Sequence, residues 1–232
     1  MTKRLPVKRL VAEAVVVVGS ILLAFAIDAA WDARQENREA LELLRGLEEE
    51  LETNDQVLAA SLEASRAGRE QLATFLALSP VEASQVSQQD AMAAVYLPHV
   101  RDWSEALSTG FLDATISSGK LSLIRSPEVR ASLARFRGEQ GNVGEVLAHL
   151  DAYNERLAEL LATHPEVRTR LVTGEGHLSG STLQAMREDE ELAAVASAKL
   201  MFWGGYLGEL GNLQESLRAT LRVVKDNGSD HR

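Results

Sequence analysis

The sequence contains no cysteine and only five prolines in 232 residues. Without cysteine the chain forms no disulfide and no thiolate metal site, which is compatible with every cellular compartment and locates nothing. Five histidines are scattered along the chain, and none has the paired spacing of a zinc motif such as HExxH. The glycine-rich stretch at 173–181 misses the GxGxxG spacing of a dinucleotide-binding loop. We therefore expect no enzyme activity, no metal and no cofactor.

The charge of the chain is acidic and unevenly distributed. The net charge is −10, with 34 Asp and Glu against 24 Lys and Arg. Four of the basic residues lie among the first nine, so that residues 28–232 carry 33 acidic against 20 basic residues, a net charge of −13. Such a surface repels nucleic acid and anionic lipid headgroups. We therefore expect no nucleic-acid partner.

The longest apolar run lies near the N-terminus. Fourteen uncharged residues, AVVVVGSILLAFAI, separate Glu13 from Asp28, and the wider span 10–31 has the length of about 20 residues that crosses a bilayer. We predict a transmembrane helix at 10–31 after a basic tail at 1–9. The alternative is a cleaved signal peptide ending near Ala24-Phe25-Ala26, and the acid at position 13 inside the apolar core argues against it.

The charges that flank this span predict its orientation. Four basic residues precede it, and three arginines follow within fifteen residues among several acids. The positive-inside tendency therefore places the N-terminus in the cytoplasm and the remaining chain outside.

Polar and small residues of the span share one helix face. Steps of three and four residues join the members of this face, which are Glu13, Val17, Ser20, Ala24, Asp28 and Trp31. Small central residues let a second helix approach closely, and a partner helix shields polar groups from lipid. We interpret this contact face as a site of helix association. The alternative is that both acids lie at the membrane interfaces, where water reaches them.

Residues 32–78 contain no proline and predict a long stalk helix that continues from the membrane. Leucines recur at seven-residue spacing at Leu44, Leu51, Leu58 and Leu72. The complementary row contains three charges, Glu48, Asp55 and Arg69. A strict two-stranded coiled coil would bury these charges, so we expect the outer half of the helix to pack into a bundle. We interpret the Glu48-Glu49-Glu50 cluster as a solvated face, with metal binding as the alternative.

Residues 79–226 predict a helical bundle, followed by a disordered tail at 227–232. Ser79 with Pro80 and Ser126 with Pro127 are typical of helix starts, and Gly119 is typical of a helix stop. A long helix follows Pro127 and ends at Pro165. Its three glycines, Gly138, Gly141 and Gly144, indicate a kink or a close helix contact, with a ligand-binding loop as the alternative. The segment 173–181 predicts a mobile loop, and the last helix covers 192–224.

An aromatic group lies in the last predicted helix. Its members are Phe202, Trp203 and Tyr206, beside two glycines. We interpret them as core residues, and the alternative is the wall of a small-molecule pocket.

The opening stretch VAEAVVVVGSILLAFAIDAAWDARQENREALELLRGLEEEL resembles the start of an uncharacterised family of bacterial single-pass membrane proteins. Glu13, Gly19, Asp28 and Trp31 carry the resemblance, and residues 117–136 look like the second recurring stretch of the family. The resemblance implies a retained anchor and a bacterial source. It implies no activity and no functional residue.

We therefore predict an all-α, single-pass protein of the bacterial inner membrane. We expect an interaction or assembly module whose partners are the lipid bilayer and either copies of itself or another membrane protein. The alternative function is a sensor-like domain outside the cytoplasm that binds a small ligand between helices and signals through a membrane partner.

Overall fold

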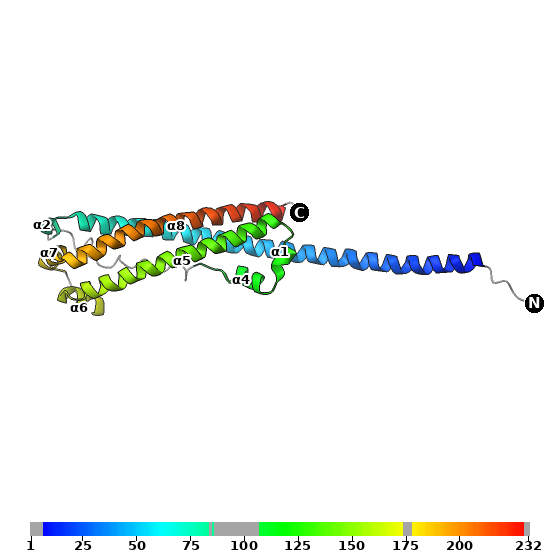
Figure 1. The fold of residues 1–232 in the computed structure, drawn as a ribbon, viewed down its shortest axis with the longest axis horizontal. Helices are drawn as coiled ribbons and strands as arrows, with labels where there is room; N and C mark the ends of the chain where they lie inside the picture. Colours follow the sequence, from blue (N-terminus) through cyan, green and yellow to red (C-terminus); the bar gives the residue numbers. More distant parts are fainter. Residues whose placement is uncertain (1–6, 84, 86–106, 174–177, 230–232) are drawn as a thin grey trace, which may run out of the picture.

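The computed structural model describes residues 7–83, 85, 107–173 and 178–229, and these residues form helices and connections without a strand. The elements are α1 (Val7–Ala77), α2 (Pro80–Ala83), α4 (Gly110–Ser117), the 3₁₀ helix η1 (Lys120–Leu123), α5 (Pro127–Leu161), α6 (Pro165–Thr173), α7 (Gly180–Glu188) and α8 (Glu190–Ser229). The prediction of an all-α chain is confirmed for this part. The molecule is an elongated bundle from which the first half of α1 projects as a single rod (Figure 1).

Helix α1 is continuous over 71 residues, as expected from a stretch with no internal proline after position 7. The seven-residue leucine row is buried within the bundle of the same chain, with Leu51 and Leu58 almost fully covered. The charges that argued against a coiled coil lie beside this row and contact α8. Arg218 Nε lies 2.8 Å from Asp55 Oδ1, and Arg69 Nε donates to the carbonyl of Leu200.

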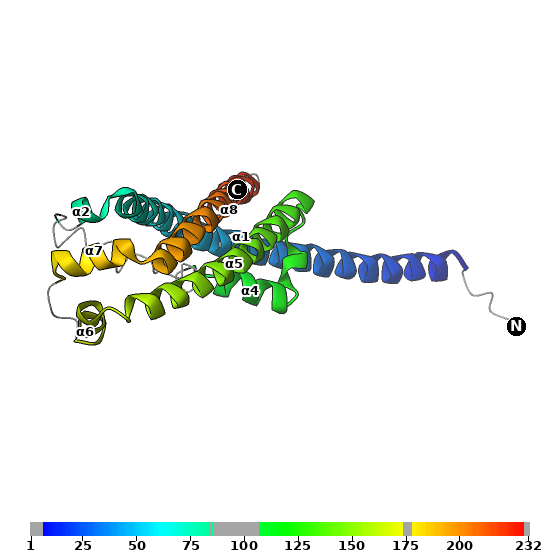
Figure 2. The same ribbon diagram turned by 60° about the vertical axis from the view of Figure 1, so that its left-hand side comes forward.

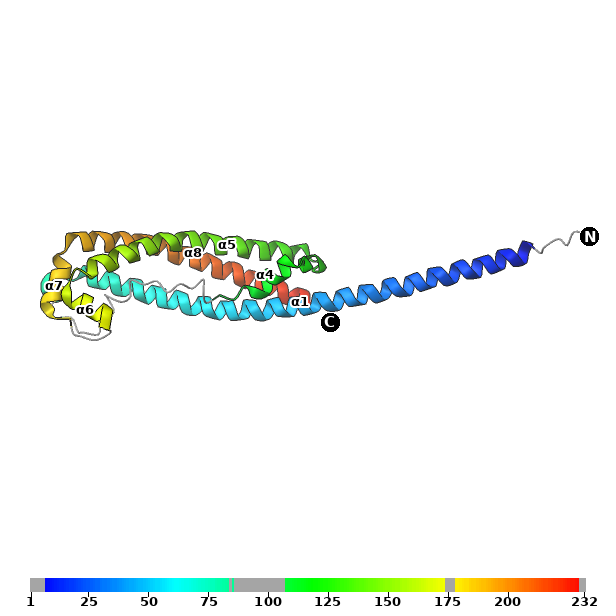
Figure 3. The same ribbon diagram turned by 90° about the horizontal axis from the view of Figure 1, so that it is seen from below.

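Helices α5 and α8 form the central antiparallel pair. Contacts join the start of α5 to the end of α8, where Thr220 Oγ1 donates to the carbonyl of Ser132 at 3.1 Å. Buried leucines at three- and four-residue spacing line both helices. Helix α8 also packs along α1, so it lies between the other two long helices (Figures 2 and 3). Helix α8 is therefore the central helix of the bundle, in contact with both α1 and α5.

The predicted helix ends are confirmed in three places. Ser79 and Glu82 form a reciprocal capping box, in which the Ser79 N–H donates to Glu82 Oε2 at 2.9 Å and the Glu82 N–H donates to Ser79 Oγ. Ser126 caps α5 by accepting from the Val129 N–H, and Pro127 occupies the first turn. Gly119 has φ of 73° after α4, a backbone conformation that favours glycine.

Other boundary predictions need correction. Helix α5 ends at Leu161, and Pro165 begins α6 rather than ending the long helix. Helix α8 continues to Ser229, so the predicted disordered tail is helical at 227–229. Helix α1 joins the bundle from Ala40 onward, which means that the bundle includes most of the predicted stalk. Residues 86–106 of the predicted bundle and 174–177 of the predicted loop fall outside the described residues. The loop prediction is wrong at Thr173 and at 180–181, which are helical in α6 and α7.

The three glycines of α5 do not make a close helix contact. The helix runs through Gly138, Gly141 and Gly144, and a Cβ added at any of them would meet no heavy atom within 4 Å among the described residues. The prediction of a close contact is therefore wrong for this part of the chain.

Candidate functional site

The first part of α1 is apolar and exposed. It is the one helix of the described chain that is long and apolar enough to cross a membrane, with a window of mean hydropathy 1.9 that no other described element buries. Val15, Val16 and Phe25 each expose about two thirds of their surface. An exposed apolar surface of this length has no driving force to remain in water, because burying apolar area is favourable.

The predicted contact face lies along this exposed rod. All six of its residues are exposed, including Val17 at 57% and Trp31 at 64%. Ser20 Oγ donates to the Val16 carbonyl at 2.8 Å, so this hydroxyl is satisfied within its own helix. Gly19 has no described neighbour within 4 Å of an added Cβ. The bundle of the same chain therefore leaves this face exposed, and the neighbouring Gly19 is open to close approach.

The spacing of charges along the rod determines how deep the two acids would lie. The uncharged stretch between Glu13 and Asp28 is about 21 Å long, shorter than a hydrocarbon layer of about 30 Å. The next charges, Arg9 and Asp32, are about 34 Å apart along the axis, which matches that layer. In a helix that spans such a layer, both acids therefore lie about 4 to 6 Å inside its edges.

The aromatic residues of α8 do not form one group. Trp203 and Tyr206 are 1% and 0% exposed and belong to the core. Phe202 is 38% exposed and packs against Tyr153 of α5, with ring centroids 5.2 Å apart. The interpretation as core therefore describes Trp203 and Tyr206, whereas Phe202 lies at the surface of the α5–α8 contact.

A buried lysine lies beside Trp203. Lys199 is 0% exposed, its Nζ donates to Asn154 Oδ1 at 2.5 Å and lies 4.7 Å from the centroid of the Trp203 ring. Asn154 Nδ2 in turn donates to Asp151 Oδ1 at 3.2 Å. Burial lowers the pKa of Lys199 to about 7, and the charge of Asp151 opposes this shift.

Sequence reasoning missed this lysine, although a signal was present. The buried positions of α8 step by four and three residues, and Lys199 occupies one of these steps. A lysine in the middle of an apolar stripe is therefore detectable from the sequence as a buried charge.

The acid cluster of α1 has a structural role that the solvated-face interpretation did not include. Glu50 accepts from the backbone N–H groups of Phe111 and Leu112, both at 2.9 Å, at the start of α4. The neighbouring Asn54 exchanges two hydrogen bonds with the backbone of Ser108. The solvated interpretation is therefore wrong for Glu50. The described residues contain no group of three or more His, Cys, Asp or Glu side chains placed to hold a metal ion.

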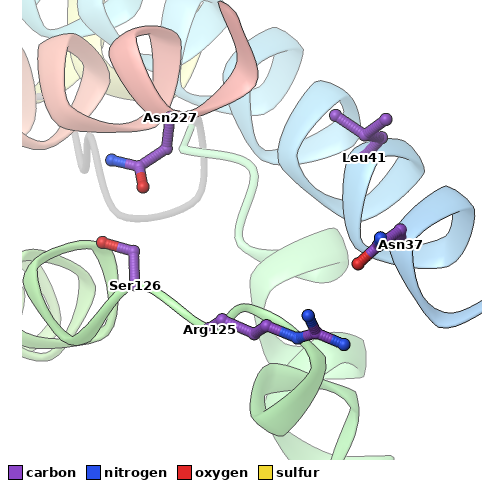
Figure 4. A pocket seen from close by; sticks show the side chains of 5 residues that line it. All are labelled: Asn37, Leu41, Arg125, Ser126 and Asn227. Atoms are coloured by element: carbon purple, nitrogen blue, oxygen red, sulfur yellow. The ribbon is translucent and has the colours of Figure 1, made fainter. Parts of the chain in front are cut away.

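Two pockets lie where α1 meets the rest of the bundle. The first has a volume of about 550 Å³ and lies where α1 leaves the bundle, and its lining comes from three segments: Asn37 and Leu41 of α1, Arg125 and Ser126 before α5, and Asn227 of α8 (Figure 4). The second, of about 620 Å³, lies between α1 and α8. Its lining includes Asp55 and Arg218, which pair with each other.

Comparisons with models of protein families, with curated proteins and with solved structures find no match to this chain.

Proposed function

We propose that the chain is a membrane-anchored interaction module of a bacterial cell. In this proposal α1 spans the inner membrane with the N-terminus in the cytoplasm, the bundle lies outside, and the contact face from Glu13 to Trp31 binds a second membrane helix. The observation that supports the proposal is the spacing of charges along the exposed apolar helix, since a span of α1 that crossed a layer of about 30 Å would take both Glu13 and Asp28 inside it.

The cost of these acids favours a partner. An ionisable side chain near the centre of a membrane helix costs at least about 2.5 kcal/mol on insertion scales, and less toward the edges. The bundle of the same chain covers none of this face. A second helix removes the cost when it supplies hydrogen-bond donors or a positive charge at the two depths.

The chemistry of the face favours a different chain over a parallel copy. Two parallel copies would place Glu13 beside Glu13 and Asp28 beside Asp28, and like charges in a low dielectric repel unless one is protonated. A partner helix with basic or hydroxyl side chains about 22 Å apart along its axis can donate hydrogen bonds to both acids and shield them from lipid. Homo-oligomers remain an outcome that the test distinguishes.

The test is the mass of the full-length protein extracted from membranes in mild detergent, measured by light scattering with the co-purifying chains identified. We expect a stoichiometric complex that Glu13→Leu, Asp28→Leu and Ala24→Leu each weaken. Ala29→Leu is the matched control, since it makes the same change as Ala24→Leu about 140° around the helix. A monomer of unchanged mass in all variants would remove the proposal.

A sensor-like domain with a ligand near the aromatic residues is the second candidate. The buried Lys199 beside Trp203 favours this candidate, because its amino group lies over the Trp203 ring and introduces a polar group into an otherwise apolar contact between helices. Tryptophan fluorescence of the full-length protein, titrated with cell-extract fractions, tests it. A response that Trp203→Phe abolishes would support sensing, and a flat response would contradict it.

A further inference from the structure

The end of the bundle from which α1 emerges lies close to the membrane plane if α1 spans the bilayer, and this inference rests on that part of the proposed function. Arg125 Nη2 lies 3.4 Å from Glu36 Oε2 of α1. Glu36 follows Asp32 by four residues, or about 6 Å of helix. The polar layer on each side of the hydrocarbon is about 5 to 7 Å thick. The guanidinium of Arg125 therefore lies at the height of the lipid headgroups.

The pocket of about 550 Å³ begins at the outer edge of this layer, since Asn37 and Leu41 follow Asp32 by about 8 and 14 Å of helix. Its polar groups come from segments far apart in the sequence, with Asn37 on α1, Arg125 and Ser126 before α5, and Asn227 on α8 (Figure 4). Asn227 Nδ2 donates to the Val223 carbonyl, which leaves the amide oxygen as an acceptor. The pocket thus combines one cation and neutral amides, and Leu41 adds an apolar wall.

A carboxylate stands next to the cation. The ion pair between Arg125 and Glu36 is exposed, with 63% and 57% of the two side chains accessible. Exposed pairs of this kind contribute little to stability, so both groups are available to a ligand that offers the opposite charges. A ligand that fits therefore carries a negative and a positive group a short distance apart.

We propose that this pocket binds the headgroup of a zwitterionic phospholipid with a primary ammonium group, the phosphate on Arg125 and the ammonium toward Glu36. An arginine guanidinium matches phosphate oxygens with two parallel N–H donors. A primary ammonium donates hydrogen bonds, which a quaternary ammonium does not. The net charge of −13 on residues 28–232 disfavours an anionic lipid and leaves a neutral headgroup without net repulsion.

The test uses the full-length protein in nanodiscs of phosphatidylcholine doped with either phosphatidylethanolamine or phosphatidylglycerol, with retained lipids counted by native mass spectrometry. We expect preferential retention of phosphatidylethanolamine, reduced about tenfold by Arg125→Gln. Glu36→Gln should remove the preference over phosphatidylcholine while retaining phospholipid binding. Arg168→Gln is the control, since it makes the same change at an exposed position of α6 at the far end of the bundle. It should leave the retention of all three lipids unchanged.

Several results would overturn the proposal. These are equal retention of the three lipids, a preference for phosphatidylglycerol, or retention that Arg125→Gln does not alter although circular dichroism shows an intact fold. Binding of soluble glycerophosphoethanolamine without selection among bilayer lipids would assign the pocket to a free phosphodiester and would also overturn it. Protection of residues 14–27 of α1 from a non-specific protease separates the two proposals, because lipid shields this segment only when α1 is inserted in the nanodisc. An inserted α1 without lipid selection removes only the pocket, whereas an α1 that does not insert removes both.

Discussion

Lys199 makes the stability of the bundle depend on pH in a predictable direction. Its pKa is lowered from 10.5 to about 7 by burial, and its described neighbours include the neutral Asn154, the Trp203 ring and, more distantly, the Asp151 carboxylate. Between pH 7 and 10.5 the unfolded chain binds a proton that the folded chain has lost, so the free energy of unfolding rises with pH. Below pH 7 Lys199 is protonated in both the folded and the unfolded state. The free energy of unfolding then no longer changes with pH through this group.

The magnitude follows from the pKa difference. Each pH unit between the two pKa values contributes about 1.4 kcal/mol, so raising the pH from 7.5 to 9.0 should increase the free energy of unfolding by about 2 kcal/mol through this group. The assay is urea unfolding of the full-length protein in a mild detergent, followed by far-ultraviolet circular dichroism at the two pH values. Lys199→Met is the reference, because it removes the titrating group while retaining an unbranched side chain.

The comparison uses the difference between the protein and this variant, so that all other titrating groups cancel. If the two proteins gained the same stability between pH 7.5 and 9.0, Lys199 would be charged in the folded state throughout. The reasoning about burial would then be refuted, and the contacts with Asn154 and the Trp203 ring would be sufficient to hold an ammonium in the core.

Three further predictions concern the packing of the bundle. Glu50→Ala removes the acceptor of two backbone N–H groups at the start of α4, so we expect the free energy of unfolding in urea to fall by about 1 to 2 kcal/mol and hydrogen exchange at Phe111 to become faster. The exposed control Glu49→Ala should show neither effect. Gly141→Ala should raise the free energy of unfolding by about 0.5 to 1 kcal/mol, because its added methyl group meets no described atom within 4 Å, and an unchanged or lower midpoint would contradict this. Gly46→Ala should not raise the free energy of unfolding in this way, because its Cβ would fall within 3 Å of the Phe111 ring and displace the ring. A gain equal to that of Gly141→Ala would contradict the contact between Gly46 and Phe111.

Local periodicity was sufficient to predict the long helices. The seven-residue leucine row of α1 and the three- and four-residue spacing of α5 depend only on the geometry of one helix, and the buried residues follow both patterns. The serine and proline signals at Ser79 and Ser126 act within four residues, and their hydrogen bonds form as predicted. The starts of α2 and α5 could therefore be predicted from the sequence.

Contacts between distant segments could not be predicted in the same way. In the sequence Glu50 is one of three adjacent acids. Its role as the cap of α4 depends on a hydrogen bond from Phe111, which is 61 residues away. Helices α6 and α7 were missed because they are short. Ser179 caps α7 locally by accepting from the Thr182 N–H, but the bond that holds Ser179 to Glu166 of α6 joins two helices and has no local pattern. The pocket of about 550 Å³ joins residues 37, 125 and 227, a combination that no local pattern contains.

The continuity of α1 also has a mechanical consequence. From Trp31 to Ala77 the helix extends about 69 Å without a proline or a break, and it is attached to α8 by the pairs of Asp55 with Arg218 and Glu52 with Lys225. A tilt of about 5° at Trp31 therefore displaces the far end, where α6 and α7 lie, by about 6 Å (Figure 3). If α1 is anchored in a membrane as proposed, a small tilt at Trp31 would thus displace the far end of the bundle by as much as the pitch of a helix turn.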